Sequence, residues 1–171
     1  MRLFAATPLL LLSFGPPHHV KLPAATLDRE LAQAIDARVD AAQPRAAEHV
    51  LQLALDATAA RLHFGLGHRT NLAFGAEREG NCIEYAHLFA TVFERARARA
   101  RVEARAYVVH SDDARVLGER LGAPGLGDHD WNLVVVRTAE GARTLFVDPT
   151  LYDAGMGWDI RGSVAGDVRP P

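Results

Sequence analysis

Cys82, the only cysteine of the chain, lies where a glycine-containing loop passes into a predicted helix. The first turn of a helix carries unpaired N–H groups and a partial positive charge, and both favour a thiolate over a thiol. The thiolate is the nucleophilic form of cysteine, and the same N–H groups can stabilise an oxyanion when the sulfur attacks a carbonyl. A lone cysteine can equally be a small buried hydrophobe, so Cys82 alone does not decide between the two roles.

A cysteine nucleophile needs a base, and the base needs a third group that orients it. Among the eight histidines, His129 opens a predicted strand, and Asp148 ends the strand that follows. If residues 138–141 form the loop between these strands, Asp148 faces Trp131 and is the diagonal neighbour of His129 on one face. That arrangement allows a side-chain hydrogen bond, whereas a register shifted by one residue would put the two side chains on opposite faces.

The apolar pattern predicts two helices before the cysteine. The first is capped by Thr26, and its apolar face consists of Leu27, Leu31, Ile35 and Val39. The second has Pro44 in its first turn and an apolar face that extends to Leu62. Residues 65–80 contain several glycines and no hydrophobic period, so we expect a loop there.

The elements from the cysteine onward define the predicted fold class. A third helix starts at Asn81 and is apolar nearly all round, which indicates a central buried helix. A strand is predicted over residues 102–108, followed by a polar connection over 111–128. The runs 131–137 and 144–147 indicate an antiparallel hairpin. We therefore expect an α+β fold, with N-terminal helices and a cysteine-bearing helix packed on an antiparallel sheet.

Three segments together resemble the transglutaminase-like superfamily of papain-type cysteine enzymes. That family has Gly-x-Cys at a helix start, His-x-Trp at the start of a strand and Asp-Pro-Thr at the end of the next. The corresponding segments here are, in the same order, Gly80-Asn81-Cys82, His129-Asp130-Trp131 and Asp148-Pro149-Thr150. The resemblance covers residues 44–158. It implies that Cys82 is the nucleophile, His129 the general base and acid, and Asp148 the group that orients His129, with no cofactor and no metal.

The resemblance implies acyl transfer from a peptide or amide through a thioester. Because the chain is small and shows no accessory domain, we expect water to be the acceptor. The predicted activity is then that of a cysteine peptidase or amidase acting on a peptide or protein substrate. The alternatives are a cross-linking transglutaminase, in which an amine accepts the acyl group, and a non-catalytic peptide-binding module on the same fold.

The chain departs from the family pattern before the cysteine, where no Gln or Trp is placed to line an oxyanion hole. Asn71, Asn81 and His68 are the candidate side chains for that role. The motif Arg78-x-Gly80-x-Cys82-x-Glu84 also resembles arylamine N-acetyltransferases, but those proteins are much longer and their aspartate segment differs. Residues 128–131 resemble a stretch of peptide N-glycanases, without the zinc-binding cysteines of those enzymes.

Length and charge narrow the classes of partner. A chain of 171 residues suffices for one domain with a buried core. It has 19 basic and 21 acidic residues, and its net charge of −2 offers no general attraction to nucleic acid. The oligomeric state is not indicated by the sequence.

The two ends of the chain differ from its middle. Residues 3–14 form an apolar run that is too short to cross a bilayer, which takes about 20 residues, so no stable membrane insertion is expected. The run is typical of a signal peptide and predicts a periplasmic or secreted protein, a cytoplasmic one being the alternative. We thus divide the chain into a signal peptide and linker (1–25), a transglutaminase-like domain (26–158) and a flexible tail (159–171).

Overall fold

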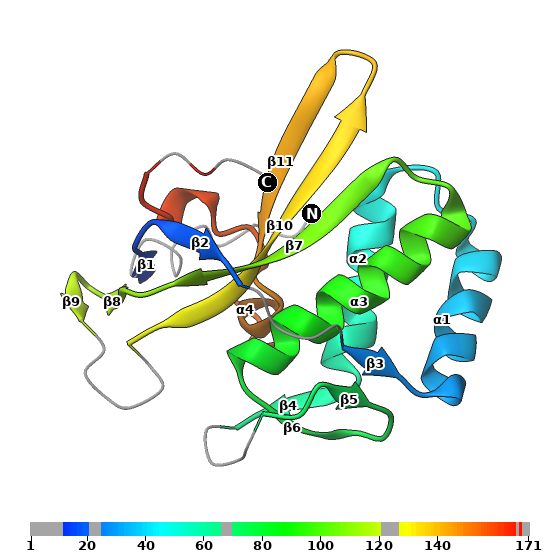
Figure 1. The fold of residues 1–171 in the computed structure, drawn as a ribbon, viewed down its shortest axis with the longest axis horizontal. Helices are drawn as coiled ribbons and strands as arrows, with labels where there is room; N and C mark the ends of the chain where they lie inside the picture. Colours follow the sequence, from blue (N-terminus) through cyan, green and yellow to red (C-terminus); the bar gives the residue numbers. More distant parts are fainter. Residues whose placement is uncertain (1–11, 21–24, 66–69, 121–126, 167, 169–171) are drawn as a thin grey trace, which may run out of the picture.

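The structure is a computed structural model that describes residues 12–20, 25–65, 70–120, 127–166 and 168. Three long helices lie on one side of an antiparallel sheet (Figure 1). The helices are α1 (Arg29–Ala42), α2 (Ala47–Ala59), α3 (Cys82–Ala100), α4 (Pro149–Asp153) and the 3-10 helix η2 (Arg161–Ser163). The predicted α+β class with an antiparallel sheet is confirmed.

The main sheet has the strand order β11-β10-β7-β2, and each neighbouring pair is antiparallel. Its strands are β2 (Pro17–His19), β7 (Ala104–Ser111), β10 (His129–Thr138) and β11 (Gly141–Val147). The shorter strands are β1 (Leu12–Phe14), β3 (Thr26–Leu27), β4 (Leu62–Phe64), β5 (Ala73–Phe74), β6 (Arg78–Gly80), β8 (Ala114–Val116) and β9 (Glu119–Arg120). They form one antiparallel sheet, β1-β8-β9, and two parallel pairs, β3-β5 and β4-β6.

Side chains of the main sheet alternate between two hydrophobic clusters. Val134 and Val136 of β10 belong to the cluster that includes Phe89 and Phe93 of α3. Leu133 of the same strand belongs to a second cluster on the other side of the sheet. That cluster is completed by residues from both ends of the chain and from the site region, namely Phe14, Val109, Ala114, Trp131, Phe146, Leu151 and Ile160. The sheet is therefore covered on both faces, which suits its long apolar strands.

The hairpin register and the cysteine-bearing helix agree with the sequence analysis. Arg137 faces Ala142, as expected, although the ladder extends one pair further, to Thr138 and Gly141. The connecting turn is thus shorter than the predicted loop, and Gly141 allows it because its φ of 136° is open to glycine. Helix α3 follows Asn81 directly, and most of its first three turns are buried, so the predicted central buried helix is confirmed.

Several predicted boundaries before α3 were wrong. Asp28, not Thr26, caps α1, because its Oδ1 accepts a hydrogen bond from the Leu31 N–H at 2.7 Å. Thr26 instead pairs with Ala73 in the two-stranded sheet β3-β5. Leu62 lies in β4 beyond the end of α2, and the predicted loop over residues 65–80 contains β5 and β6. Such two- and three-residue strands carry no hydrophobic period that a sequence could display.

The described parts of both chain ends pack onto the domain. Phe14, in the predicted leader, is buried, and its C=O accepts a hydrogen bond from the Ala165 N–H at 2.9 Å. Ile160, in the predicted flexible tail, is fully buried, and its N–H donates to the Phe146 C=O. The stretch from residue 159 to 166 therefore differs from the loose tail that we expected. A single apolar anchor has no periodicity, which is why it could not be predicted from the sequence.

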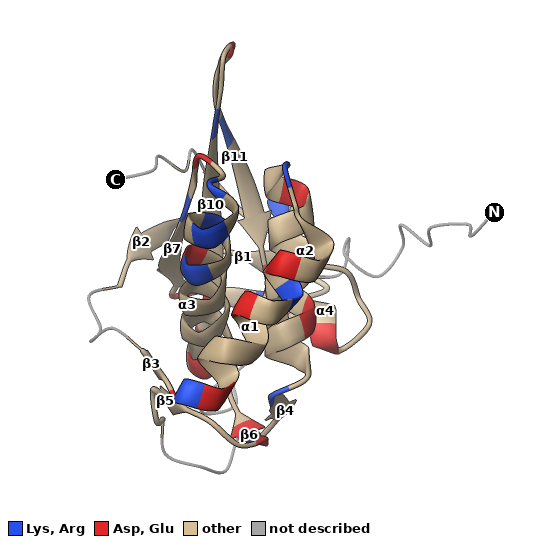
Figure 2. Cartoon of the chain, turned by 90° about the vertical axis from the view of Figure 1, so that its right-hand side faces the viewer, with Lys and Arg blue, Asp and Glu red and all other residues tan. Residues whose placement is uncertain are grey.

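Arginine–carboxylate pairs join the exposed sides of α1 and α3. Arg95 of α3 binds Asp36 of α1 with an N–O distance of 2.7 Å, and Arg99 binds Asp40 at 2.5 Å. Figure 2 shows the alternating basic and acidic residues on these neighbouring helices. Among the described residues, no helix combines the length and apolar character needed to cross a membrane.

Buried charge anchors the start of α3. Glu84 is completely buried, and its Oε1 accepts hydrogen bonds from the Arg78 side chain at 2.8 Å and from the Asn71 N–H at 3.0 Å. Its Oε2 accepts from the Asn81 N–H at 2.9 Å. One carboxylate thus joins β6, the preceding loop and the first turn of the helix.

We expect Glu84→Ala to lower the free energy of unfolding by about 3 kcal/mol, because it leaves a partly buried arginine and two N–H groups without their acceptor. The matched control is Glu79→Ala, which removes an exposed carboxylate from the neighbouring strand and should cost less than about 0.5 kcal/mol. Urea denaturation measures both. Equal losses in the two variants would contradict the anchoring role of Glu84.

Candidate active site

His129 and Asp148 meet where the hairpin of β10 and β11 ends. The His129 Nε2 lies 2.6 Å from the Asp148 Oδ2, which is a hydrogen-bonding distance. The other carboxylate oxygen, Oδ1, accepts from the Thr150 N–H at 2.9 Å and the Leu151 N–H at 3.1 Å. Asp148 is fully buried and caps α4, so its carboxylate is held on both sides.

Cys82 lies against the same histidine from the other side of the site. It is the first residue of α3, is partly exposed and lies close enough to the His129 ring to help raise the pKa of that histidine. Because Asp148 occupies Nε2, the ring nitrogen left for Cys82 is Nδ1. The structure therefore brings together all three residues that the sequence analysis selected, from three separate elements.

The surroundings of His129 favour its protonated form. Burial opposes the charge, but the negative charge and hydrogen bond of Asp148 outweigh it, helped by the hydrogen bond and charge of Cys82. Together they raise the pKa of His129 to about 10. An imidazolium at neutral pH is the natural neighbour of a cysteine thiolate.

The first turn of α3 leaves one N–H group for an incoming oxyanion. The Asn81 Oδ1 accepts from the N–H groups of Ile83 at 3.0 Å and Glu84 at 3.4 Å, while the Tyr85 N–H donates to the Asn81 C=O. Within the described part of the chain, the Cys82 N–H is the first-turn donor that has no such partner. It belongs to Cys82 itself, the predicted nucleophile.

The side chains considered for the oxyanion hole fall in different places. Asn81 lines the cavity beside Cys82, but its carbonyl oxygen is used to cap the helix. The Asn71 Oδ1 accepts from the Ala73 N–H at 2.9 Å, and Asn71 does not line this cavity. His68 lies outside the described residues.

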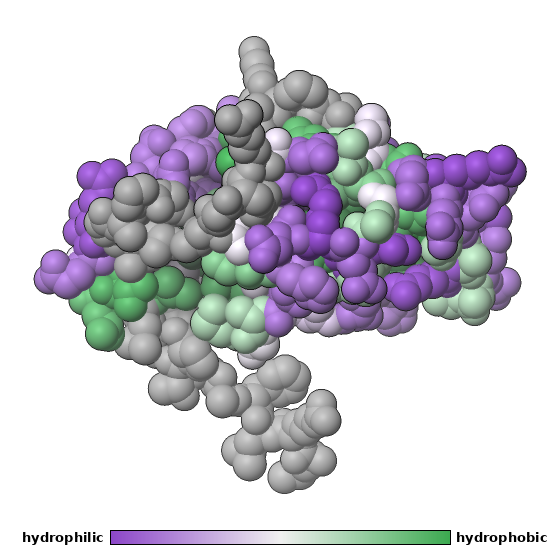
Figure 3. Space-filling model, turned by 90° about the horizontal axis from the view of Figure 1, so that it is seen from below, coloured by the Kyte–Doolittle hydropathy of each residue, from purple (hydrophilic) through white to green (hydrophobic). Residues whose placement is uncertain are grey.

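Cys82 and His129 open into a cavity of about 270 Å³. The cavity is lined mainly by apolar side chains, and its residues are Leu12, Phe14, Phe64, Asn81, Cys82, Ala114, Asp128, His129, Thr150, Leu151, Asp153, Ala154 and Met156. Phe64 is half exposed at its rim. On the face seen from below, the strongest apolar colour lies on the left, where Figure 1 places β8 and β9 (Figure 3).

Phe14 is a site residue that the sequence analysis missed. Its ring stacks on the His129 ring with 5.0 Å between centroids and an interplanar angle of 16°. It covers one face of the imidazole and comes from β1, which pairs with β8. Phe14 lies inside the apolar run that predicted a signal peptide, so no local pattern marked it as part of a site.

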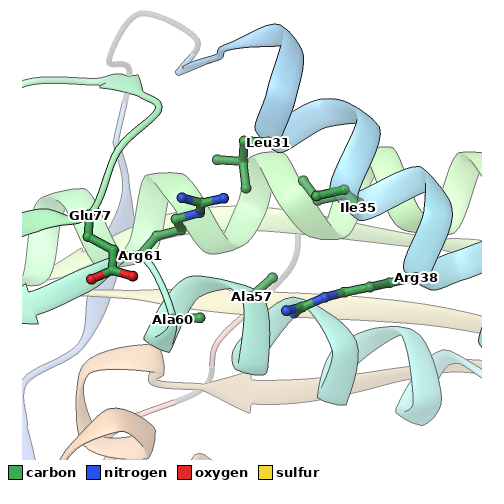
Figure 4. Close-up of a pocket in the computed structure, with 8 residues that line it drawn as sticks. Leu31, Ile35, Arg38, Ala57, Ala60, Arg61 and Glu77 are labelled. Carbon is green, nitrogen blue, oxygen red and sulfur yellow. The ribbon is translucent and has the colours of Figure 1, made fainter.

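A second cavity, between α1 and α2, has a different character (Figure 4). Its volume is about 220 Å³, and Leu31, Ile35 and Ala57 form its floor, with Arg38 and Arg61 beside it. None of the described residues that line it is a cysteine or a histidine. Among the cavities of the described residues, the first is the one that both Cys82 and His129 line, with Asp148 buried beside His129. Comparisons of the chain with protein-family models, curated proteins and solved structures found no match.

The pKa of His129 gives a prediction with a definite sign. Since the folded-state pKa of about 10 lies above the ordinary 6.5, protonation of His129 stabilises the fold fully below pH 6.5. This contribution is lost as the pH rises from 6.5 through 10. Asp148→Asn should lower the pKa of His129 and flatten that part of the stability curve. An NMR titration of the ring, with urea denaturation at each pH, measures both; an unchanged midpoint in Asp148→Asn would contradict the coupling.

Removing the Phe14 ring should destabilise the fold and expose His129. We expect Phe14→Ala to cost about 3 kcal/mol of unfolding free energy, as for other buried phenylalanines. Phe64→Ala, a half-exposed phenylalanine of the same cavity, is the control and should cost well under half as much. Urea denaturation measures the free energy of unfolding of both variants. A similar loss in the two would show that Phe14 does not pack as described.

Proposed function

We propose that the chain is a cysteine-dependent hydrolase of the transglutaminase-like superfamily, which cleaves a peptide or amide bond through a thioester intermediate. The observation that carries the proposal is that Cys82 and His129 line one cavity, while the His129 Nε2 is held 2.6 Å from the buried Asp148. Three sequence motifs in the family's order support the same assignment.

In the first half of the reaction, the Cys82 thiolate attacks the carbonyl carbon of the substrate and forms a C–S bond. The carbonyl oxygen becomes an oxyanion, to which the Cys82 N–H can donate. The imidazolium of His129 then gives its Nδ1 proton to the nitrogen of the leaving amine as the C–N bond breaks. The products of this half are the amine and a thioester on Cys82.

In the second half, neutral His129 accepts a proton from water while the water oxygen attacks the thioester carbonyl. Collapse of this tetrahedral intermediate breaks the C–S bond, releases a carboxylic acid and restores the thiolate–imidazolium pair. Asp148 acts throughout by fixing the ring so that Nδ1 faces the sulfur and by stabilising the imidazolium charge. Its hydrogen bonds to the first turn of α4 prevent it from turning away.

The lining of the cavity suggests the class of acyl group. Leu12, Phe14, Leu151 and Met156 line the cavity with Cys82, and none of the described lining residues is an arginine or a lysine. An apolar side chain next to the scissile bond would gain about 25 cal/mol for each Å² of apolar surface removed from water. The proposal is therefore hydrolysis after an apolar residue.

Export remains a proposal that is based on the apolar run 3–14. Most of this run lies outside the described residues, and its last part forms β1.

A fluorogenic peptide amide tests the proposed chemistry. We expect the wild-type chain to release the fluorophore from a substrate with leucine before the amide faster than from one with aspartate. Cys82→Ala should lose at least about 1,000-fold in rate, and His129→Ala should lose a comparable factor, because the residues act as a unit. Glu79→Ala, which alters an exposed residue away from the cavity, should retain full activity.

Two further measurements separate the alternatives. The reaction is repeated with butylamine, and the products are identified by mass spectrometry. Hydrolysis forms a carboxylic acid, whereas a transglutaminase forms a butylamide. Iodoacetamide should label Cys82 quickly at neutral pH and much more slowly in His129→Ala. Slow labelling that is indifferent to His129, together with no turnover, would indicate the binding module instead.

A further inference from the structure

A second group of histidine and carboxylate side chains lies on the main sheet, at the register position next to the one that His129 occupies. His18 of β2 and His110 of β7 are register partners, and their ring centroids are 5.1 Å apart. Asp112 follows β7 directly and approaches both rings. Asp130 is the register partner of His110 and the neighbour of His129 in β10. Because successive strand residues point to opposite faces, the side chain of Asp130 lies on the other face of the sheet from that of His129. His18, His110 and Asp112 do not line the cavity of Cys82, although the neighbouring Asp128 does.

The spacing of these polar atoms suits a metal ion. The Asp112 Oδ1 lies 3.3 Å from the His110 Nε2, and the Asp112 Oδ2 lies 3.6 Å from the His18 Nδ1. All three residues offer ligand atoms within 4.8 Å of one another. In a tetrahedral zinc site with ligands at about 2.0–2.1 Å, neighbouring ligand atoms are about 3.4 Å apart. The two measured separations are within a few tenths of an ångström of that value.

The His110 ring nitrogen that would not bind the metal has the kind of partner found in metal sites. Its Nδ1 lies 2.5 Å from the Oδ1 of Asp130, whose side chain is only 4% exposed. A metal-bound histidine typically donates its second ring N–H to such a carboxylate, which fixes the tautomer and turns the other nitrogen to the metal. Here that other nitrogen, Nε2, is the one that faces Asp112.

The site is also open to solvent on the side where an ion would enter. The side chains of His18 and Asp112 are 57% and 76% exposed, so binding would require no unfolding. Asp128 is nearby as well, with its Oδ2 3.9 Å from the His110 Nε2. Two imidazoles with carboxylate oxygens are a ligand set that divalent transition-metal ions prefer over magnesium or calcium.

We propose that His18, His110 and Asp112 bind a divalent transition-metal ion of the zinc class, with Asp130 holding His110 in place and water completing the coordination. The ion would join β2 to β7 and so fix the amino-terminal segment that carries Phe14. This inference is independent of the proposed hydrolase, because it uses neither Cys82 nor Asp148. This site could not be predicted from the sequence, because His18 lies in the predicted linker and its partners are more than 90 residues away in the chain.

Calorimetric titration of the full chain with Zn²⁺ tests the proposal. The titration is done in a Cys82→Ala background, which removes the thiolate that could bind zinc with His129. We expect one ion per chain, and at least tenfold weaker binding in His18→Ala and in Asp112→Asn. Both residues are exposed, so these variants should fold. His19→Ala changes the next histidine of the same strand and should leave the affinity unchanged.

Thermal unfolding supplies a second measurement on the same proteins. Zn²⁺ should raise the Tm of the parent chain and of His19→Ala, but not that of His18→Ala or Asp112→Asn. An ion that binds the folded state stabilises it, and the last two variants lack a ligand for the ion. The absence of binding to the parent chain would overturn the proposal. So would binding that His18→Ala and Asp112→Asn leave intact, or that His19→Ala weakens equally.

Discussion

The register of β10 against β11 is the constraint on which the candidate site depends. It places His129 and Asp148 at the same end of the hairpin and on the same face, where their side chains form a hydrogen bond of 2.6 Å. A shift of one residue would turn one of them to the opposite face and separate them. The long apolar strands keep this register, because Leu133 and Val134 must enter different hydrophobic clusters on the two sides of the sheet.

A second constraint positions the cysteine against this pair. Helix α3 is buried through most of its first three turns, so its start is fixed by packing, and Glu84 holds the first turn to β6 and the preceding loop. Gly80 permits this close approach, since a Cβ atom there would lie 3.0 Å from the Leu62 side chain. The proposed nucleophile is thus placed by buried contacts behind it, while its sulfur faces the cavity.

Sequence reasoning could predict those parts of the structure that carry a period or a short-range chemical signal. The buried helix after Asn81 and the hairpin of β10 and β11 are long and strongly patterned, and the pairing of His129 with Asp148 follows from their register. The short strands β4 and β6 had no such signal. Phe14 and His18 could not be placed, because each meets its partners through contacts between residues far apart in the chain.

The stacking of Phe14 on His129 limits where the chain could be processed if it is exported. Residues 12–14 form β1, and the Phe14 C=O is bonded to Ala165, so this segment is built into the domain from two directions. A leader peptidase that cut after Phe14 would leave one face of the imidazole open to water. Only a cut before residue 12 would preserve the packing of β1 and of the Phe14 ring against His129.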